Sequence, residues 1–303
     1  MEKRTLGSTG LDVTLLGYGA AELRGPRSWG GRQITDAEAE RILNEVLDAG
    51  INLIDTAPDY GLSETFIGRY ISHRRDEYYL ASKCGCTIVD QGEIDDFPHY
   101  FTRDNLLANI DATLRITRCD YIDIWQPHTP SVHQLEEDRI VDVMREVQET
   151  GKVRHLGLSA TLPHNWTFVD WGVFETFQIP YSALERREET LITKAVESGA
   201  GTIIRGGVAR GEPGVGVASE AAWEPWTAAG LDELREEGET RTSFLLRFTI
   251  SHPNVHTTIV ATMNPLHLAE NLRTIAQGPL APQIYAEAKR RLAGVGQRPV
   301  GLA

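Results

Sequence analysis

The chain has 303 residues, 41% of them hydrophobic, and its formal net charge is −13. This length is enough to bury a large core, whereas the negative charge disfavours nucleic acid and anionic membrane surfaces as partners. No segment has the apolar length of a signal peptide or a membrane span, and an odd count of three cysteines fits a reducing compartment. We therefore expect a cytoplasmic protein that folds as one domain over residues 1–303 and has no membrane or nucleic-acid partner.

Eight short apolar runs are spread along the chain at the spacing of a strand-and-helix repeat. They are preceded by KRTLGSTGLDVT, in which a Ser-Thr-Gly turn between two extended pieces predicts a hairpin. Short apolar runs are typical of strands that are buried on both faces, as in a parallel sheet. The predicted strands cover residues 15–19, 51–54, 78–81, 121–125, 153–158, 174–179, 202–204 and 257–260.

Apolar residues recur on one helical face between these runs. The clearest of these helical segments are 42–47, 106–114, 140–147 and 191–196. Gly50, Gly151 and Gly199 end three of the helices just before the next strand, where a left-handed cap favours glycine. Residues 205–241 are rich in Gly, Pro and Trp and are predicted to form a long loop, and a further helix is predicted around 284–292.

Eight strands that alternate with helices over about 260 residues predict an α/β fold of the (β/α)8 TIM-barrel type. We expect the N-terminal β-hairpin to close one end of the barrel and a C-terminal extra helix to follow the last strand. An open Rossmann sheet is the structural alternative. Its glycine motif would have to begin at Gly17-Tyr18-Gly19 and lacks the third glycine, so this alternative has weak support.

Polar side chains follow three successive predicted strands. Asp55, Lys83 and His128 each come after the carboxyl end of a strand, and Tyr60 follows Asp55 by five residues. In a barrel the carboxyl ends of the strands carry the active site, so we expect these four side chains to meet. Each has a structural explanation when taken alone, such as packing for a tyrosine or a helix cap for an aspartate. Their joint position at successive strand ends favours a catalytic set.

The chemistry of these four residues suits the reduction of a carbonyl by hydride. Tyr60 can donate the proton that the developing alkoxide needs, and the ammonium of Lys83 is expected to lower the high pKa of the phenol. Asp55 can hold Lys83 charged and oriented, and a neutral His128 can donate a hydrogen bond to the substrate oxygen. His133 lies five residues after His128, but no carboxylate or cysteine pattern completes a site, so we expect no metal.

Three segments resemble signatures of the aldo-keto reductase superfamily. INLIDTAPDYGLSETFIGRYI contains Asp55 and Tyr60, ASKCG contains Lys83, and DYIDIWQPH contains His128. The similarity covers nearly the whole chain, and LGSTGL with the overall layout also resembles bacterial and plant members that oxidise free sugars with NAD. The resemblance implies a monomeric or homodimeric barrel, these four residues as the catalytic set, and a nicotinamide cofactor bound across the top without a Rossmann domain.

The resemblance also implies which positions hold the cofactor. Ser159 and Gln178 match residues at the nicotinamide carboxamide, and the backbone of Gly206, Gly207 and Val208 matches donors to the pyrophosphate. The other positions implied for cofactor binding are Asp55, Arg205, Thr262, His267, Glu270 and Asn271. Of these, Glu270 and Asn271 match residues that hold the adenine, and Thr262 is expected to open a helix whose N-terminus can bind phosphate.

Some of these positions depart from the family pattern, which leaves the cofactor preference open. Ala160 replaces the asparagine of the usual Ser-Asn pair, a loss of roughly 1 kcal/mol of hydrogen bonding that His164 is a candidate to supply. Arg205 stands where many members stack an aromatic ring, and it can either stack in the same way or tie down the following loop. His267 is the residue at the position where members strict for NADPH carry a stronger base. We expect NADP(H) from its frequency in the family, with NAD(H) as the alternative.

The expected function is reduction of a small aldehyde or ketone, or the reverse oxidation of an alcohol or sugar, with Tyr60 as general acid or base. One alternative is a cofactor-binding regulatory or partner protein of the same fold with little turnover. Another is an unrelated barrel enzyme that uses Lys83 as a Schiff-base amine. Candidate walls of the substrate pocket are Trp29, Trp223, Trp226 and Trp125, of which the last equally fits the barrel core.

Overall fold

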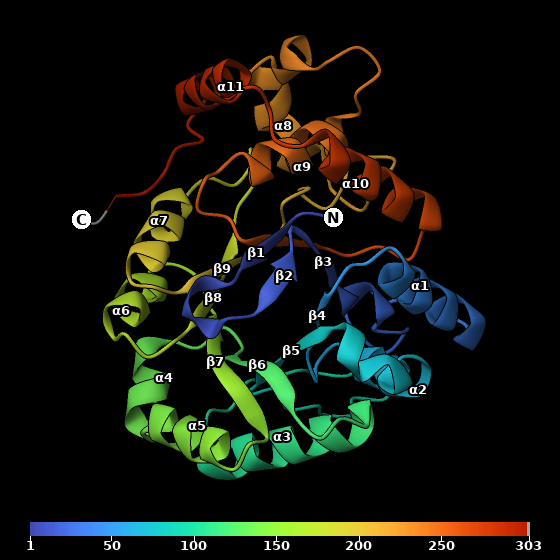
Figure 1. Cartoon of the computed structure of the whole chain (residues 1–303), viewed down its shortest axis with the longest axis vertical. Helices are drawn as coiled ribbons and strands as arrows, with labels where there is room; N and C mark the ends of the chain where they lie inside the picture. The colour runs from blue at the N-terminus through green and yellow to red at the C-terminus, as the bar shows by residue number, and fades with distance from the viewer. Residues whose placement is uncertain (302–303) are drawn as a thin grey trace.

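A computed structural model describes residues 1–301 and shows a closed barrel of eight parallel strands (Figure 1). The strands follow one another around the barrel in chain order, and the last pairs with the first to close the ring. They are β3 (Leu16–Gly19), β4 (Leu53–Asp55), β5 (Tyr79–Cys84), β6 (Ile122–Pro127), β7 (Val153–Ser159), β8 (Thr176–Pro180), β9 (Gly201–Arg205) and β10 (Thr257–Val260). Each of the eight predicted runs overlaps one of these strands, so the (β/α)8 barrel is confirmed and the open Rossmann sheet is excluded.

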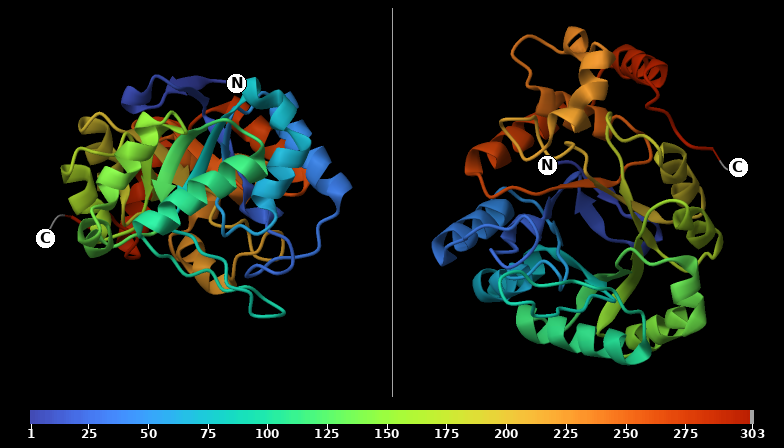
Figure 2. Two further views of the ribbon diagram at one scale, coloured as in Figure 1. Left: turned by 90° about the horizontal axis from the view of Figure 1, so that it is seen from below. Right: turned by 180° about the vertical axis from the view of Figure 1, so that it is seen from behind.

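Helices surround the ring of strands (Figures 1 and 2). The longer ones are α1 (Asp36–Asp48), α2 (Ser63–Tyr70), α3 (Arg103–Thr117), α5 (Ile140–Glu149), α7 (Glu189–Glu197), α9 (Arg241–Ile250) and α10 (Pro265–Gln277). Two short helices, α4 (Val132–Glu137) and α6 (His164–Asp170), lie between them, and α11 (Pro282–Gly294) is the predicted extra helix near the C-terminus. None of the helices within residues 1–301 has the length and hydrophobicity needed to cross a membrane.

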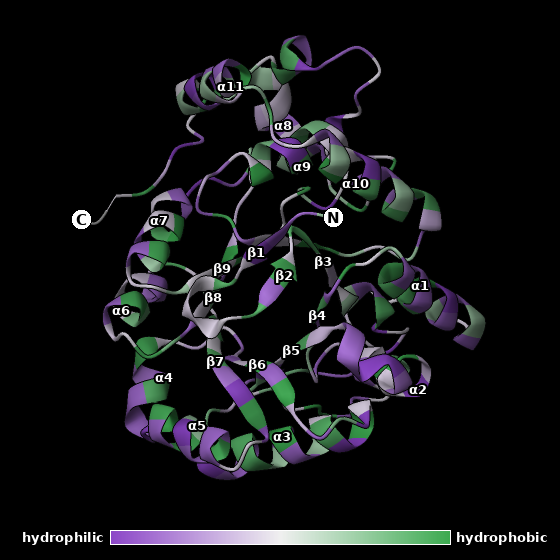
Figure 3. Cartoon of the chain, viewed as in Figure 1, coloured by the Kyte–Doolittle hydropathy of each residue, from purple (hydrophilic) through white to green (hydrophobic). Residues whose placement is uncertain are grey.

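Helix α1 shows how the sequence produces these helices. Thr35 caps it by accepting a hydrogen bond from the backbone N–H of Glu38, whose carboxylate accepts from the N–H of Thr35 in return. Apolar side chains at helical spacing form its buried face, and Figure 3 shows hydrophobic and hydrophilic residues on each of α1, α3 and α5. Gly50, Gly151 and Gly199 have φ angles of 79°, 82° and 89°, so the predicted left-handed caps are present.

The N-terminal hairpin closes one end of the barrel. Its strands β1 (Lys3–Thr5) and β2 (Asp12–Thr14) pair antiparallel, as predicted. Leu6 and Leu11 of the hairpin loop are buried in one cluster with side chains from inside the ring. The left view of Figure 2 shows the hairpin at one end of the molecule and the loops after β5 and β9 at the other. A ligand can therefore enter at the end where the loops lie, which is the carboxyl end of the strands.

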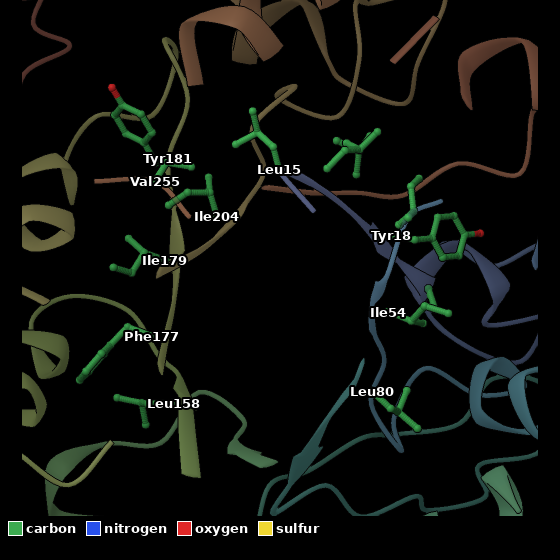
Figure 4. Close-up of a cluster of buried hydrophobic side chains, with 14 of the residues drawn as sticks. Leu15, Tyr18, Ile54, Leu80, Leu158, Phe177, Ile179, Tyr181, Ile204 and Val255 are labelled. Atoms are coloured by element: carbon green, nitrogen blue, oxygen red, sulfur yellow. The ribbon is translucent and has the colours of Figure 1, made fainter. Parts of the chain in front are cut away.

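A larger apolar cluster connects the ring of strands to the helices. Figure 4 shows part of it, with Leu80, Leu158, Phe177 and Ile204 arranged around the ring. These side chains are fully or almost fully buried, and they fix the positions of the strands on which the polar residues of the opposite end are mounted.

The stretch 205–241 differs from the predicted loop. Helix α8 (Glu220–Ala228) forms within it, and the side chain of its N-cap, Ser219, accepts a hydrogen bond from the backbone N–H of Ala222. Trp223 and Trp226, one turn apart, are buried in the core cluster. Pro225 lies inside this segment, and an internal proline predicts a helix break, so the sequence did not indicate a helix here. Burial of the two indole side chains outweighs the destabilisation of the helix by the proline.

Candidate active site

A buried ion pair lies at the carboxyl end of the barrel. Lys83, at 0% exposure, donates from Nζ to both carboxylate oxygens of Asp55 at 2.9 and 2.7 Å and to the carbonyl oxygen of Thr56 at 2.9 Å. Burial opposes a charged ammonium, but the carboxylate of Asp55 outweighs it and raises the pKa of Lys83. An ammonium held in this way is a poor nucleophile, which argues against the Schiff-base alternative.

Two buried amides complete the surroundings of the Asp55 carboxylate. Gln178 Nε2 donates to Asp55 Oδ1 at 2.7 Å, and Gln126 Nε2 donates to the same oxygen at 3.2 Å. The hydroxyl of Ser159 donates to Gln178 Oε1 at 3.2 Å. Residues of the five consecutive strands β4 to β8 thereby form one hydrogen-bonded network. Ser159 and Gln178, which the resemblance places at the nicotinamide carboxamide, are thus in direct contact.

Tyr60 lies next to this network and lines a cavity together with Asp55. Lys83 Nζ is 5.2 Å from the centroid of the Tyr60 ring. Burial raises the pKa of Tyr60 to about 12, and the nearby ammonium of Lys83 opposes that rise without cancelling it. The sequence argument foresaw the direction of the lysine effect but not the larger effect of burial. At neutral pH the phenol therefore retains its proton.

His128 follows β6 and contacts a cluster that the sequence did not predict. Its Nδ1 is 3.0 Å from Asp59 Oδ2 and 3.4 Å from Cys86 Sγ, and His99 Nε2 is 3.1 Å from the same oxygen of Asp59. Burial lowers the pKa of His128, so its imidazole is neutral at pH 7, as expected. Burial alone would raise the pKa of Asp59, but the two histidines outweigh it and hold that pKa well below its usual range.

The expectation of no metal rested on His133, which is 81% exposed and whose contact with Glu137, at 3.8 Å, lies on the surface. The cluster around His128 instead comes from three different loops. Sequence spacing gave no signal for it because Asp59 and Cys86 stand 69 and 42 residues before His128. Its members meet only when β4, β5 and β6 lie side by side in the barrel.

A cavity of about 610 Å³ opens at the carboxyl end of the barrel and is lined by most of the residues implied for cofactor binding. These residues are Asp55, Gln178, Arg205, Gly206, Val208, Thr262, His267, Glu270 and Asn271. Four residues of the expected set lie outside its lining. Ser159 and Lys83 are buried and donate to Gln178 and Asp55. The ring of His128 packs edge-on against that of Tyr60, with 6.0 Å between the centroids, and contacts Asp59 through Nδ1. The carbonyl oxygen of Gly207 accepts a hydrogen bond from the hydroxyl of Thr249.

Several features of this cavity were not predicted. Arg24, Arg32 and Arg210 line it in addition to Arg205, so four guanidinium groups face three lining carboxylates, those of Glu22, Asp55 and Glu270, in a chain whose net charge is −13. These arginines come from the loops after β3 and β9, where no residue pattern marks a cavity-facing side chain. Among the described residues, the guanidinium of Arg205 makes no hydrogen bond or ion pair, so nothing supports the suggestion that it ties down its loop.

Three expectations about the cavity need correction. Thr262 does not open the following helix, because α10 begins at Pro265 and is capped by Asn264, whose side chain accepts from the N–H of Leu266. His164 does not line the cavity and so does not replace the amide that is missing at Ala160. Of the four tryptophans considered as pocket walls, Trp29 lines the cavity. The other three, Trp125, Trp223 and Trp226, are buried in the core.

The chain is similar in sequence to known proteins of one family. The model of the Aldo/keto reductase family matches residues 15–291. Aldo-keto reductase YhdN of Bacillus subtilis is 32% identical over 219 residues, and the match covers 70% of this chain and 63% of that protein. The NADH-specific methylglyoxal reductase of Escherichia coli is 29% identical over 204 residues, covering 62% of this chain and 61% of that protein.

A solved structure is also similar over almost its whole length. The holo form of aldo-keto reductase AKR11C1 from Bacillus halodurans has a TM-score of 0.82 and 25% sequence identity, and the match covers 96% of each chain. By contrast, the chain spans less than two thirds of the length of the two curated relatives. Because the family model extends from β3 to α11, the chain belongs to the aldo/keto reductase family.

Proposed function

We propose that this protein is an oxidoreductase that transfers hydride between a nicotinamide cofactor and the carbonyl carbon of a small aldehyde or ketone, or in the reverse direction from an alcohol or sugar. One observation carries the proposal. Tyr60 and Asp55, supported from behind by Lys83, line the same cavity as Gln178 and Arg205. A proton donor and an anion-binding surface thus share one space, as this reaction needs.

Each of three residues of the site has a separate proposed role in the reaction. Tyr60 donates its phenolic proton to the oxygen of the substrate as negative charge develops there, and it accepts that proton in the reverse reaction. Lys83, held by both oxygens of Asp55, places positive charge beside the ring and stabilises the phenolate that remains. His128 is proposed to donate a hydrogen bond to the substrate oxygen, which its neutral imidazole can do.

The cavity suits an extended, anionic dinucleotide. Gln178 is proposed to hold the carboxamide, the loop from Gly206 to Val208 and the arginines the phosphates, and Glu270 and Asn271 the adenine. When bound, a reduced nicotinamide supplies the hydride. We propose NADP(H) as the cofactor, because several arginines line the cavity. NAD(H) is the alternative, since one relative is an NADH-specific methylglyoxal reductase.

The test follows nicotinamide absorbance with purified protein, NADPH or NADH, and a panel of reactive aldehydes. Wild type is compared with Tyr60→Phe and with Tyr70→Phe, a matched change on α2 at a tyrosine outside the cavity. We expect turnover by wild type and Tyr70→Phe, and a loss of about 100-fold or more in Tyr60→Phe with cofactor binding retained.

Equal turnover in Tyr60→Phe and wild type would remove the proposed role of Tyr60. Tight binding of NADPH or NADH by all three proteins, without turnover of any aldehyde or of the corresponding alcohols with oxidised cofactor, would refute the oxidoreductase proposal and favour a regulatory, cofactor-binding protein of the same fold.

A further inference from the structure

We propose that Asp59, Cys86, His99 and His128 form a binding site for a zinc-type divalent ion, with one ligand from each residue. The ligand atoms of these four side chains all lie within 4.8 Å of one another. The closest pairs are 3.0, 3.1 and 3.4 Å apart. In a tetrahedral site with bonds of ~2.0–2.3 Å, neighbouring ligand atoms lie roughly 3.3–3.8 Å apart. Only small side-chain movements separate the present positions from such a site.

The backbone holds three of the four ligands, Cys86, His99 and His128, in place. Cys86 and His99 face each other across an antiparallel bridge, flanked by hydrogen bonds from Tyr100 N to Gly85 O and from Thr87 N to Pro98 O. His128 is fixed by its backbone N–H, which donates to the carbonyl oxygen of Cys84 at 3.0 Å. These three ligands therefore lie on paired segments at the ends of neighbouring strands, so an ion would need to order little backbone on binding.

Two further features of the cluster, one buried oxygen without a partner and one orienting contact, are those expected of a metal site. Asp59 Oδ1 is buried and has no hydrogen-bond partner among residues 1–301, so the carboxylate retains acceptor capacity that burial makes costly. His99 Nδ1 lies 3.1 Å from the hydroxyl of Thr129, a contact that orients the ring with Nε2 toward Asp59. Histidines that bind metals are commonly held in this way through their second ring nitrogen.

The donor set selects the kind of ion. Two imidazoles and a thiolate favour zinc and similar transition ions over magnesium or calcium, which prefer oxygen ligands. Binding would release the thiol proton of Cys86, and the resulting thiolate and the Asp59 carboxylate would together balance a charge of 2+. The side chains of His99 and His128 are 21% and 13% exposed, whereas Asp59 and Cys86 are buried, so an ion would enter past the imidazoles.

A bound ion would also determine which ring nitrogen of His128 carries the proton. The catalytic importance of that proton rests on the proposed function, whereas the metal binding itself does not. The cluster contacts Nδ1 of that ring. A metal on Nδ1 leaves the proton of the neutral imidazole on Nε2, where it can be donated to a substrate oxygen. Without a metal, the Asp59 carboxylate favours the proton on Nδ1. The ion would thus be a positioning element of the active site.

The test is titration of metal-stripped protein with Co²⁺, followed by visible and near-ultraviolet absorption. A tetrahedral cobalt thiolate has intense visible bands and a sulfur-to-cobalt charge-transfer band. We expect both to saturate at about one equivalent and to be displaced by Zn²⁺. Cys86→Ser should lose the charge-transfer band, and His99→Gln should weaken binding at least tenfold. Cys119→Ser changes a buried cysteine that is not a member of the cluster and should leave the spectrum unchanged.

Failure of the folded wild-type protein to bind Co²⁺ or Zn²⁺, or an unchanged charge-transfer band in Cys86→Ser, would overturn the proposal. Far-ultraviolet circular dichroism checks the fold, and His99→Gln, at a partly exposed position, serves if Cys86→Ser does not fold. Metal binding without aldehyde turnover would leave this site standing and count against the reductase proposal. Aldehyde turnover by protein that binds no metal would overturn the metal site and leave the reductase proposal standing.

Discussion

The buried pair of Lys83 and Asp55 leads to a quantitative prediction about stability. Lys83→Met removes the ammonium and leaves the Asp55 carboxylate at 2% exposure with only two amide donors. Asp55→Asn leaves the ammonium buried without its counter-charge. Breaking a buried pair from one side costs about 3–5 kcal/mol, because an uncompensated charge remains. Two independent losses would therefore sum to roughly 6–10 kcal/mol.

The double variant should be far more stable than that sum. It contains neither charge, and the side-chain amide oxygen that Asp55→Asn introduces can still accept from Gln178 and Gln126, so we expect a total loss of only ~1–4 kcal/mol. The coupling energy is then at least ~2 kcal/mol. Urea unfolding followed by tryptophan fluorescence and circular dichroism measures it, provided that the two probes give coincident transitions. If the loss of stability in the double variant equals the sum of the two single-variant losses to within ~0.5 kcal/mol, the interpretation of this pair as mutually dependent charges is refuted.

Three other predictions follow from single positions. Burial raises the pKa of Glu64 to about 7 from 4.5, so its contribution to stability is complete below pH 4.5 and is lost as the pH rises through 7. The loss is about 3 kcal/mol, and Glu64→Gln should abolish this part of the pH dependence of Tm, whereas parallel curves for the two proteins would contradict it. Arg205→Met should weaken NADPH binding about 10-fold by fluorescence titration, and an unchanged Kd would remove this residue from the cofactor site. Gly157→Ala places a Cβ 2.4 Å from Thr176 Oγ1 and should cost ~1–3 kcal/mol in urea unfolding; a variant as stable as wild type would show that β7 and β8 can separate locally.

The fold could be predicted because its signals are local. Short apolar runs, helical periodicity and glycines such as Gly199 recur along the chain, and each repeat depends on neighbours in sequence. The meeting of Asp55 and Lys83 also follows from local information once the barrel is assumed, since both stand at the ends of adjacent strands. Strand ends converge by topology, so position in sequence was enough.

The parts that could not be predicted depend on contacts between distant loops. Asp59 and His99 meet across 40 residues through a contact that no spacing rule encodes. The position of Arg210 in the cavity depends on the path of an irregular loop. Burial reversed the expected net shift of the Tyr60 pKa, because the depth of a side chain cannot be obtained from composition or periodicity. Helix α8 was missed because its stability comes from the burial of Trp226 in tertiary contacts rather than from helix propensity.

The most direct test of the central proposal uses a reduced nicotinamide labelled with deuterium at the transferred position. Wild-type protein, the labelled cofactor and an aldehyde from the panel are mixed for a single turnover, and the product is analysed by mass spectrometry. The proposed reaction predicts an alcohol that carries one deuterium on the former carbonyl carbon and none exchanged with solvent. An alcohol without the label, or no alcohol from any aldehyde while the cofactor stays bound, would contradict hydride transfer in this cavity.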